Sequence, residues 1–283
     1  MNIYITALYP TFIRPHADKW QQEGNKVVIT PYFDPFAAQS ADVLFAEWGD
    51  RNAIAIQNFP AKNAMKIVRI HRYEIYTDIW KHFDFNQWDE IIITTRPKAE
   101  YLMKKVDVPP RFTVIPCGIK TEEIRLNPQP DSKKIAYMGL FSRKKGLGEL
   151  EFIANSLPDY QFYLGGRFQE PDLKEKLEKN PRLHFVGWIE NKSGFFADMK
   201  YVISTSVCES QQLTLLEGMA SGCKPLIRDW IGADRIYKQE WVYKDLRGLK
   251  QLLEGDYEPE KYRQFVKANY DWHRTHERLT ELL

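Results

Sequence analysis

The chain has 283 residues, enough for two domains that each bury a hydrophobic core. Its 40 basic and 38 acidic residues give a formal net charge of +2, which excludes a global field drawing the protein onto nucleic acid or an anionic membrane. No apolar run approaches the roughly 20 residues of a membrane span, and the first residues do not form a charged leader followed by a long apolar segment. We therefore expect a soluble protein, or at most a peripherally membrane-associated one.

The cysteines and the histidines near the C-terminus give no sign of a disulfide framework or a metal site. Cys117, Cys208 and Cys223 are scattered, odd in number and without a Cys-x-x-Cys pair, which fits the reducing cytoplasm. His273 and His276 have no cysteine nearby, and we expect them to be exposed and not to bind a metal. The sequence also contains no Asp-x-Asp, a common clamp for divalent metals. We therefore expect neither a metal nor another cofactor.

The first half of the chain alternates short apolar runs with helical patterns. The runs are continuous rather than alternating, which is typical of strands covered on both faces of a parallel sheet. The predicted strands are 3–7, 26–30, 43–46, 53–56, 67–70, 91–95 and 112–115, and the predicted helices between them include 16–23 and 97–105. This alternation predicts a doubly wound α/β domain.

The same alternation restarts after a polar, proline-containing segment at 122–133, which we interpret as an interdomain linker. The predicted strands of the second half are 134–138, 160–164, 183–186, 201–205, 225–228 and 241–243. The predicted helices are 147–156, 171–179, 194–199, 213–220, 245–254 and two further ones from residue 259 onward. We therefore place the domains at 1–124 and 125–258, with the helices of 259–283 packing back toward the first domain.

Ligands of doubly wound domains bind beyond the carboxyl ends of the strands, so the residues at those ends are the first candidates for a site. Gly139 ends one strand and is followed by a basic turn that contains Arg143 and Lys145, where cations would suit a diphosphate. An ordinary solvated basic turn explains these residues equally well. Gly166 also ends a strand, and His71 follows one, where it could face a cleft or be a satisfied structural residue.

The segment 204–227 carries the most specific pattern of the chain. The predicted helix 213–220 places Glu217 on the same stripe as Leu213 and Ala220, which should face the core, and Glu209 lies in the turn before that helix. Glutamate is seldom buried without a partner. A buried ion pair with an arginine or lysine would satisfy Glu217, and so would a polar binding site at the start of the helix.

Together these motifs resemble the family 4 glycosyltransferases, which are retaining enzymes of the GT-B architecture. The stretch C-E-S-Q-Q-L-T-L-L-E-G-M-A-S-G-C-K-P-L-I is similar to the family's E-G-F-G-L-V-L-L-E-A-M-A-x-G-x-P-V-I, with seven residues between the two glutamates. Further matches, in chain order, are Glu23 to Val27, the strand that ends in His71, Val114 to Ile119, Gly139 to Gly146, Gly165 with Gly166, and Phe185 to Gly187. The resemblance implies two Rossmann-like domains that face a central cleft.

The resemblance also implies a role for each candidate residue. Glu217 would bind the ribose of a nucleotide-sugar, Glu209 would hold hydroxyls of the transferred sugar, and His71 would lie across the cleft beside the reacting carbon. The free backbone N–H groups of the helix start would bind the phosphates, and two side chains would neutralise the leaving diphosphate in place of a metal. These phosphate-binding residues are Gln211, Gln212 and Leu213 by their backbone, and Arg143 and Lys145 by their side chains.

Two departures from the family pattern affect this interpretation. The family's Gly-Arg-Leu is Gly139-Leu140-Phe141 here, so Arg143 would have to replace the usual arginine. Gln211 and Gln212 stand where the family has Phe-Gly, so their side-chain amides could change which sugar hydroxyls are read. The sequence does not give the donor's sugar and nucleobase, nor the acceptor.

Two alternatives to transfer onto a saccharide, lipid-linked or small-molecule acceptor remain open. In one, the acceptor is hydroxymethylated DNA, and binding uses a basic patch formed by Arg96, Lys98, Lys104, Lys105 and Arg111. The same patch could instead bind lipid headgroups or be a solvated helix face. In the other alternative, the chain binds a nucleotide-sugar without turnover.

Overall fold

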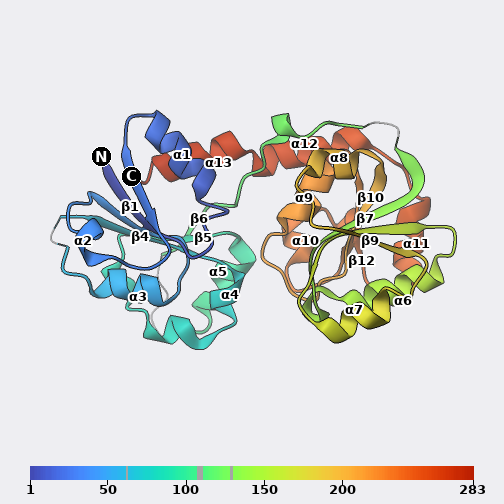
Figure 1. The fold of residues 1–283 in the computed structure, drawn as a ribbon, viewed down its shortest axis with the longest axis horizontal. Coiled ribbons are helices and arrows are strands. Elements are labelled where there is room, and N and C mark those ends of the chain that lie inside the picture. Colours follow the sequence, from blue (N-terminus) through green and yellow to red (C-terminus); the bar gives the residue numbers. More distant parts are fainter. Residues whose placement is uncertain (62, 107–110, 128–129) are drawn as a thin grey trace. The chain divides into compact units, whose positions relative to one another are not determined.

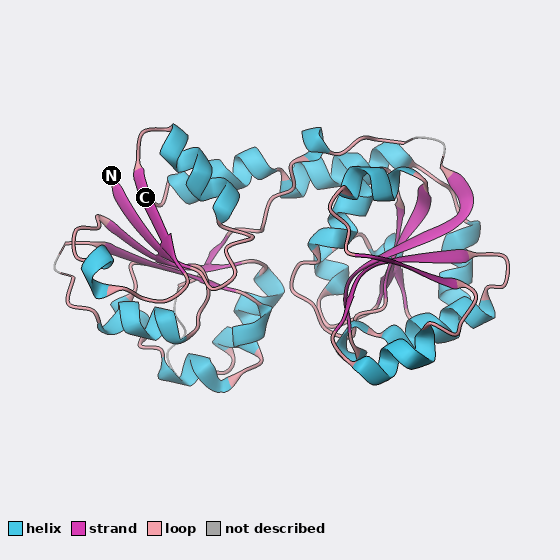
Figure 2. Ribbon diagram, viewed as in Figure 1, coloured by secondary structure: helices cyan, strands magenta, loops and turns pink. Residues whose placement is uncertain are grey.

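The computed structural model describes residues 1–61, 63–106, 111–127 and 130–283. The chain divides into two compact units, one formed by residues 1–117 with 274–283 and the other by residues 118–273. Each unit holds one parallel sheet with helices on both faces (Figures 1 and 2). Both sheets have six strands among the described residues, which confirms the predicted doubly wound α/β class.

The first unit has the strand order β2-β1-β3-β4-β5-β6. Its strands are β1 (Asn2–Thr6), β2 (Lys26–Thr30), β3 (Val43–Ala46), β4 (Met65–Ile70), β5 (Glu90–Ile93) and β6 (Thr113–Val114). Its helices are α1 (Arg14–Gln22), α2 (Pro35–Ala38), α3 (Arg51–Asn58), α4 (Arg72–Ile75), α5 (Arg96–Met103) and most of α13 (Trp272–Thr280), with 3-10 turns at Asp78–His82 and Phe85–Gln87. Because β2 and β3 lie on opposite sides of β1, the order of the strands reverses there.

Successive strand residues of this sheet pack on opposite faces. Ile3 and Ile5 of β1 contact the core under α1 and α13, whereas Tyr4 faces the core under α3 and α5. Figure 1 shows α1 and α13 together on one face, with α2 to α5 on the other. Both faces are therefore buried, as continuous apolar strands require.

The segment 53–56 is a helix and not the predicted strand. The carboxylate of Asp50 accepts hydrogen bonds from the backbone N–H groups of Asn52 and Ala53, which caps the start of α3. Ala53 and Ile56 then face the core one helical turn apart. A short apolar run cannot by its periodicity distinguish a strand from a buried helix, and here the N-cap decides.

The C-terminal helix buries a histidine that was expected to be exposed. His276 of α13 is 6% exposed, and its Nδ1 lies 3.2 Å from Nδ1 of His16 in α1. Trp20 donates a hydrogen bond of 2.8 Å to the hydroxyl of Thr280 beside this pair. The expectation was wrong because partners 260 positions away in the sequence satisfy the ring.

The second unit has the strand order β12-β11-β10-β7-β8-β9. Its strands are β7 (Asp131–Phe141), β8 (Gln161–Phe168), β9 (Leu183–Gly187), β10 (Met199–Ser204), β11 (Lys224–Arg228) and β12 (Val242–Tyr243). Its helices are α6 (Leu147–Ser156), α7 (Pro171–Leu177), α8 (Lys192–Ala197), α9 (Leu213–Ala220), α10 (Ala233–Ile236), α11 (Leu246–Glu254) and α12 (Pro259–Tyr270), with 3-10 turns at Thr121–Glu123, Arg143–Lys145 and Gln239–Trp241. Helices α8, α9, α10 and α12 cover one face, and α6, α7 and α11 cover the other.

The predicted linker 122–133 lies within the second unit where the structure describes it; residues 128–129 lie outside the described residues. Asn127 donates its backbone N–H to the carbonyl of Ser221, and the hydroxyl of Ser221 donates to the carbonyl of Arg125. These bonds fasten the segment to the end of α9. The low periodicity and the prolines therefore indicate an irregular segment here, but this segment is hydrogen-bonded to the second unit and is not a linker between the two units.

Arg263 of α12 also binds this segment to the second unit, and replacing it should destabilise the unit. Its guanidinium donates hydrogen bonds to the carbonyls of Thr121, Ile124 and Ala220. Charged hydrogen bonds contribute about 1.5–3 kcal/mol each, but water can replace part of these three bonds because Arg263 is only half-buried. We therefore expect Arg263→Ala to lower the free energy of unfolding by roughly 2–5 kcal/mol in denaturant titrations. Exposed Lys267 of the same helix provides the control, and an equal loss in Lys267→Ala would contradict this account.

Candidate functional site

The motif of the second unit lies where its strand order reverses. From β7 the chain continues through β8 and β9 on one side, then crosses to β10 on the other, and the carboxyl ends of β7 and β10 meet at this switch point. Gly139 lies near the end of β7, Glu209 follows β10, and α9 begins at Leu213 directly after it. The region beyond the carboxyl ends of the strands at such a switch point is the usual ligand position in open α/β sheets.

Glu217 is buried at this edge with only one of its two carboxylate oxygens satisfied. Its Oε1 accepts a hydrogen bond of 2.6 Å from Nζ of Lys192, a half-exposed side chain at the start of α8. Its Oε2 has no hydrogen-bond partner in the described part of the chain, although the residue is only 8% exposed. The ion pair left open by the sequence therefore exists, but it leaves a strong buried acceptor available to a ligand hydroxyl.

The basic 3-10 turn Arg143–Lys145 places the side chain of Lys145 in contact with Glu209. Nζ of Lys145 donates to Oε1 of Glu209, and the backbone carbonyl of Lys145 accepts a hydrogen bond of 2.9 Å from the hydroxyl of Thr205. Gly146 permits this approach, because its φ is +73° and a Cβ there would lie 2.0 Å from the carbonyl oxygen of Thr205. The turn after β7 thus carries an ammonium group to the end of β10.

Arg143 is directed elsewhere. Its guanidinium pairs with Glu170 and Asp172 at the start of α7. Residues two apart in a 3-10 turn project about 120° from each other, so Arg143 and Lys145 leave the turn on different faces. The structure brings Lys145 to the motif glutamates and does not bring Arg143 there.

The glutamines before α9 differ in their surroundings. Gln212 is buried at the N-cap of α9, and its side-chain oxygen accepts a hydrogen bond of 2.6 Å from the hydroxyl of Ser204. Gln211 is half-buried. The hydroxyl of Thr214 donates a hydrogen bond of 2.9 Å to the carbonyl of Met138, which fixes the first turn of α9 beside β7. The backbone N–H groups at this helix start have no partner within the helix.

Gly166 is explained by chain packing. A Cβ at Gly166, with φ of +148°, would lie 1.8 Å from the carbonyl oxygen of Gly139 on the neighbouring strand. A Cβ at Gly139 itself would meet nothing within 4 Å. Gly166 therefore permits β7 and β8 to approach, while the space beside Gly139 is open.

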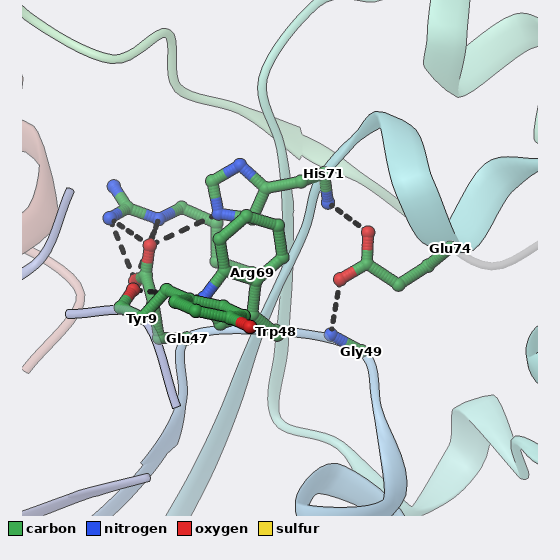
Figure 3. A network of polar contacts seen from close by, with 7 residues as sticks. All are labelled: Tyr9, Glu47, Trp48, Gly49, Arg69, His71 and Glu74. Atoms are coloured by element: carbon green, nitrogen blue, oxygen red, sulfur yellow. Dashed lines mark hydrogen bonds and ion pairs between the residues drawn. The ribbon is translucent and has the colours of Figure 1, made fainter. Parts of the chain in front are cut away.

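His71 belongs to the first unit, where it joins a buried polar network (Figure 3). Its Nε2 lies 3.0 Å from Oε1 of Glu47, the residue that follows β3. The guanidinium of Arg69 donates to both oxygens of that carboxylate, with the two shortest contacts at 2.7 Å. The imidazole also stacks against Trp48, with ring centroids 4.2 Å apart, and against Phe12.

Glu74 lies on the other side of His71 and should make the stability of the first unit depend on pH. Its carboxylate accepts hydrogen bonds from the backbone N–H groups of Gly49 and His71 (Figure 3). Burial nevertheless raises the pKa of Glu74 above its ordinary value of 4.5. The folded state therefore holds this proton more tightly than the unfolded state does. The resulting stabilisation is complete below pH 4.5 and is lost as the pH rises through the raised pKa.

We expect the free energy of unfolding to fall over this pH window by about 1.4 kcal/mol for each unit by which the pKa of Glu74 is raised. In Glu74→Gln that contribution should be absent, even though the variant is less stable at every pH because its amide can accept only one of the two N–H groups. Denaturant titrations of both proteins from about pH 4 to 8 measure the difference, and parallel curves would contradict the prediction.

Several residues around Glu217 and His71 could not be recognised as site residues from the sequence. Lys192 reaches Glu217 from 25 positions away, and Glu47 reaches His71 from 24. The register of β3 with β4 pairs Ala46 with Val68, which places Glu47 beside Arg69. Only the sheet topology brings these residues together.

The predicted basic patch is smaller than the sequence suggests. Lys98 is 2% exposed, and its Nζ donates a hydrogen bond of 2.6 Å to the hydroxyl of Tyr76. Arg96, Lys104, Lys105 and Arg111 are exposed, and residues 107–110 lie outside the described residues. Within the described chain no helix has the length and apolarity to cross a membrane, and no three His, Cys, Asp or Glu side chains group as they would around a metal ion.

Comparison with solved structures identifies the fold as the GT-B fold of glycosyltransferases. HepE from Anabaena, solved with UDP and glucose, is 13% identical with a TM-score of 0.78, and the match covers 99% of this chain and 98% of that one. Sucrose-phosphate synthase from Thermosynechococcus elongatus is 15% identical with a TM-score of 0.77, over 99% and 97% of the two chains. At such identities the likeness establishes the fold alone.

A third structure is TarM from S. aureus, of which a point mutant was solved with fondaparinux, alpha-GlcNAc-glycerol and UDP. It is 17% identical with a TM-score of 0.71, and the match covers 85% of this chain but only 55% of TarM. Residues 132–246, which form most of the second unit, match the family model described as glycosyl transferases group 1. No curated protein matches the chain.

Proposed function

We propose that the protein is a glycosyltransferase that moves a sugar from a nucleotide-sugar to a hydroxyl acceptor. The observation that carries this proposal is the arrangement of Glu209, Glu217 and Lys145 at the switch point of the second unit, inside the segment that matches the group 1 family model. The proposed acceptor is a saccharide, a lipid-linked molecule or a small molecule.

In this proposal the nucleoside diphosphate part of the donor binds to the second unit. The free Oε2 of Glu217 accepts hydrogen bonds from the two ribose hydroxyls, and Lys192 stays on Oε1. The diphosphate lies between Lys145 and the backbone N–H groups at the start of α9, above the open space beside Gly139. Lys145 then leaves Glu209, whose oxygens become available to the hydroxyls of the sugar.

The chemistry assigned to these groups is electrostatic. Lys145 and the helix start stabilise the negative charge that develops on the leaving diphosphate, without a metal. We further propose that the anomeric configuration is retained, with the acceptor attacking on the face from which the diphosphate leaves and a phosphate oxygen taking its proton. His71 of the first unit is the candidate to contact the sugar beside the reacting carbon, and the enzyme itself supplies no nucleophile.

Thermal unfolding with added nucleotides tests donor binding. UDP is the first ligand to test, because HepE and TarM were solved with it. A ligand that binds only the folded state stabilises it by about 2.7 kcal/mol at 100 times its dissociation constant, so UDP or another nucleoside diphosphate should raise the Tm with EDTA present. The Tm of Glu217→Ala should not respond. No shift with any nucleoside diphosphate would contradict the proposed site.

A second candidate function is binding of a nucleotide-sugar without turnover. It is favoured by the pairing of Arg143 with Glu170 and Asp172, which leaves Lys145 as the cation that meets the motif glutamates from this turn. In this case a nucleoside diphosphate would stabilise the protein, but no nucleotide-sugar would be consumed. Stabilisation and consumption measured on one preparation separate the two functions.

A further inference from the structure

The first unit contains an ion pair whose burial is costly. The side chains of Glu47 and Arg69 are fully buried, and Nη1 of Arg69 has no hydrogen-bond partner among the described residues. Moving two charges out of water costs free energy, and their mutual attraction offsets this cost only when the geometry is excellent and every hydrogen bond is made. A protein with a hydrophobic pair of similar volume at these positions would often be at least as stable. Stability alone is therefore a weak explanation for this pair.

The pair lies at the edge where a ligand would be expected. Glu47 follows β3, His71 follows β4, and the loop after β1 brings Phe12 to the imidazole. The strand order of this unit reverses between β1 and β3, so the network surrounds its topological switch point.

The ring of His71 is held by two aromatic side chains and through one of its nitrogens. Trp48 and Phe12 stack on the imidazole. The carboxylate of Glu47 faces Nε2 (Figure 3). An ionised carboxylate only accepts hydrogen bonds, so Nε2 must carry a proton. In the neutral ring Nδ1 is then unprotonated and acts as an acceptor; Figure 3 shows this nitrogen on the side of the ring away from Glu47.

Arg69 determines what Glu47 can do. Its guanidinium donates to both carboxylate oxygens, which fixes the orientation of the carboxylate. The trio therefore orders a single tautomer of His71, with the protonated nitrogen inward.

We propose that Glu47, fixed by Arg69, is a positioning residue that holds His71 as the Nε2–H tautomer, so that Nδ1 accepts a hydrogen bond from a substrate hydroxyl during transfer. This inference rests on the proposed glycosyl transfer, because it specifies what His71 contributes to that site. It predicts that the other tautomer, with Nδ1 protonated, cannot accept the hydrogen bond of that hydroxyl and lowers turnover.

The test removes the ion pair as a unit. Glu47→Met/Arg69→Met replaces both buried charges with side chains of similar length, and so avoids leaving one charge unpaired. The matched control is Glu151→Met/Lys176→Met, which removes an ion pair between α6 and α7. We expect kcat for nucleotide-sugar consumption to fall at least about tenfold in the Glu47/Arg69 variant, with the donor KM within about twofold of wild type, and no change in the control.

Coupling with His71→Ala distinguishes positioning from a merely structural role. If Glu47 acts through His71, adding His71→Ala to the double variant should lower kcat by less than about threefold more, because the two losses share one cause. Losses that multiply, or a double variant with wild-type kcat, would overturn the proposal.

A direct reading of the tautomer keeps the test independent of turnover. In protein with 15N-labelled histidine, long-range proton–nitrogen spectra should show His71 protonated at Nε2 in the wild type and a tautomer mixture in the Glu47/Arg69 variant. An Nδ1–H tautomer in the wild type, or an unchanged tautomer in the variant, would overturn the inference. If the wild type consumes no nucleotide-sugar, the proposed function fails, and the spectra still decide the tautomer.

Discussion

Glu217→Ala should abolish glycosyl transfer while leaving the fold intact. The variant removes the carboxylate whose free Oε2 we assign to the ribose, together with the acceptor of Lys192. Two hydrogen bonds from ribose hydroxyls to an ionised group, at about 1.5–3 kcal/mol each, correspond to a loss of roughly 10²- to 10⁴-fold in kcat/KM. Initial rates at varied donor concentration measure this loss.

The fold of this variant should survive because Lys192 is half-exposed and can be hydrated when its partner is removed. Circular dichroism and the Tm check this point. Glu175→Ala on α7 is the control, because its side chain is 81% exposed and lies on a helix without motif residues. Full activity of Glu217→Ala would refute the assignment, whereas an equal loss in the control would trace the effect to something other than the site.

Lys145→Met and Arg143→Met should differ sharply in activity. Lys145 contacts Glu209, so its loss removes the ammonium group assigned to the leaving diphosphate, and we expect kcat to fall by about 10²- to 10³-fold. Arg143 is exposed and already paired with Glu170 and Asp172, so its loss should lower kcat less than about fivefold. Single-turnover rates at saturating donor compare the two variants.

Either of two outcomes would change this assignment. Equal losses in both variants would mean that Arg143 leaves its carboxylates and joins the diphosphate when the donor binds, as its place in the sequence motif suggests. Wild-type activity in Lys145→Met would remove this lysine from the mechanism. Lys144→Met, which alters the residue between them, provides the baseline for any change in this turn.

Much of the fold could be predicted because buried parallel strands leave a direct record in the sequence. Ile3 and Ile5 pack on one face of the first sheet and Tyr4 on the other, so nearly every residue of such a strand is apolar. The same rule failed at 53–56, where an apolar run of four residues is part of α3. There the deciding signal was one aspartate cap, which a pattern of hydrophobicity does not include.

The candidate site likewise has a part that could be predicted from the sequence and a part that could not. The spacing of Glu209 and Glu217 is local and was visible in the sequence. The side chains around them were not, because Lys192 comes from another strand-to-helix connection and Arg143 meets carboxylates 27 and 29 positions later. Glu47 illustrates this most clearly, since only the pairing of β3 with β4 brings it to Arg69.

Consumption of a nucleotide-sugar tests the central claim most directly. Purified protein in EDTA is incubated with a panel of nucleotide-sugars and a mixture of saccharide, lipid-linked and small-molecule acceptors. The released nucleoside diphosphate is measured beside the glycosylated product. We predict release of the diphosphate from at least one donor, matched by product formation, and neither in Glu217→Ala. A protein whose Tm rises with the diphosphate but which consumes no nucleotide-sugar would contradict glycosyl transfer.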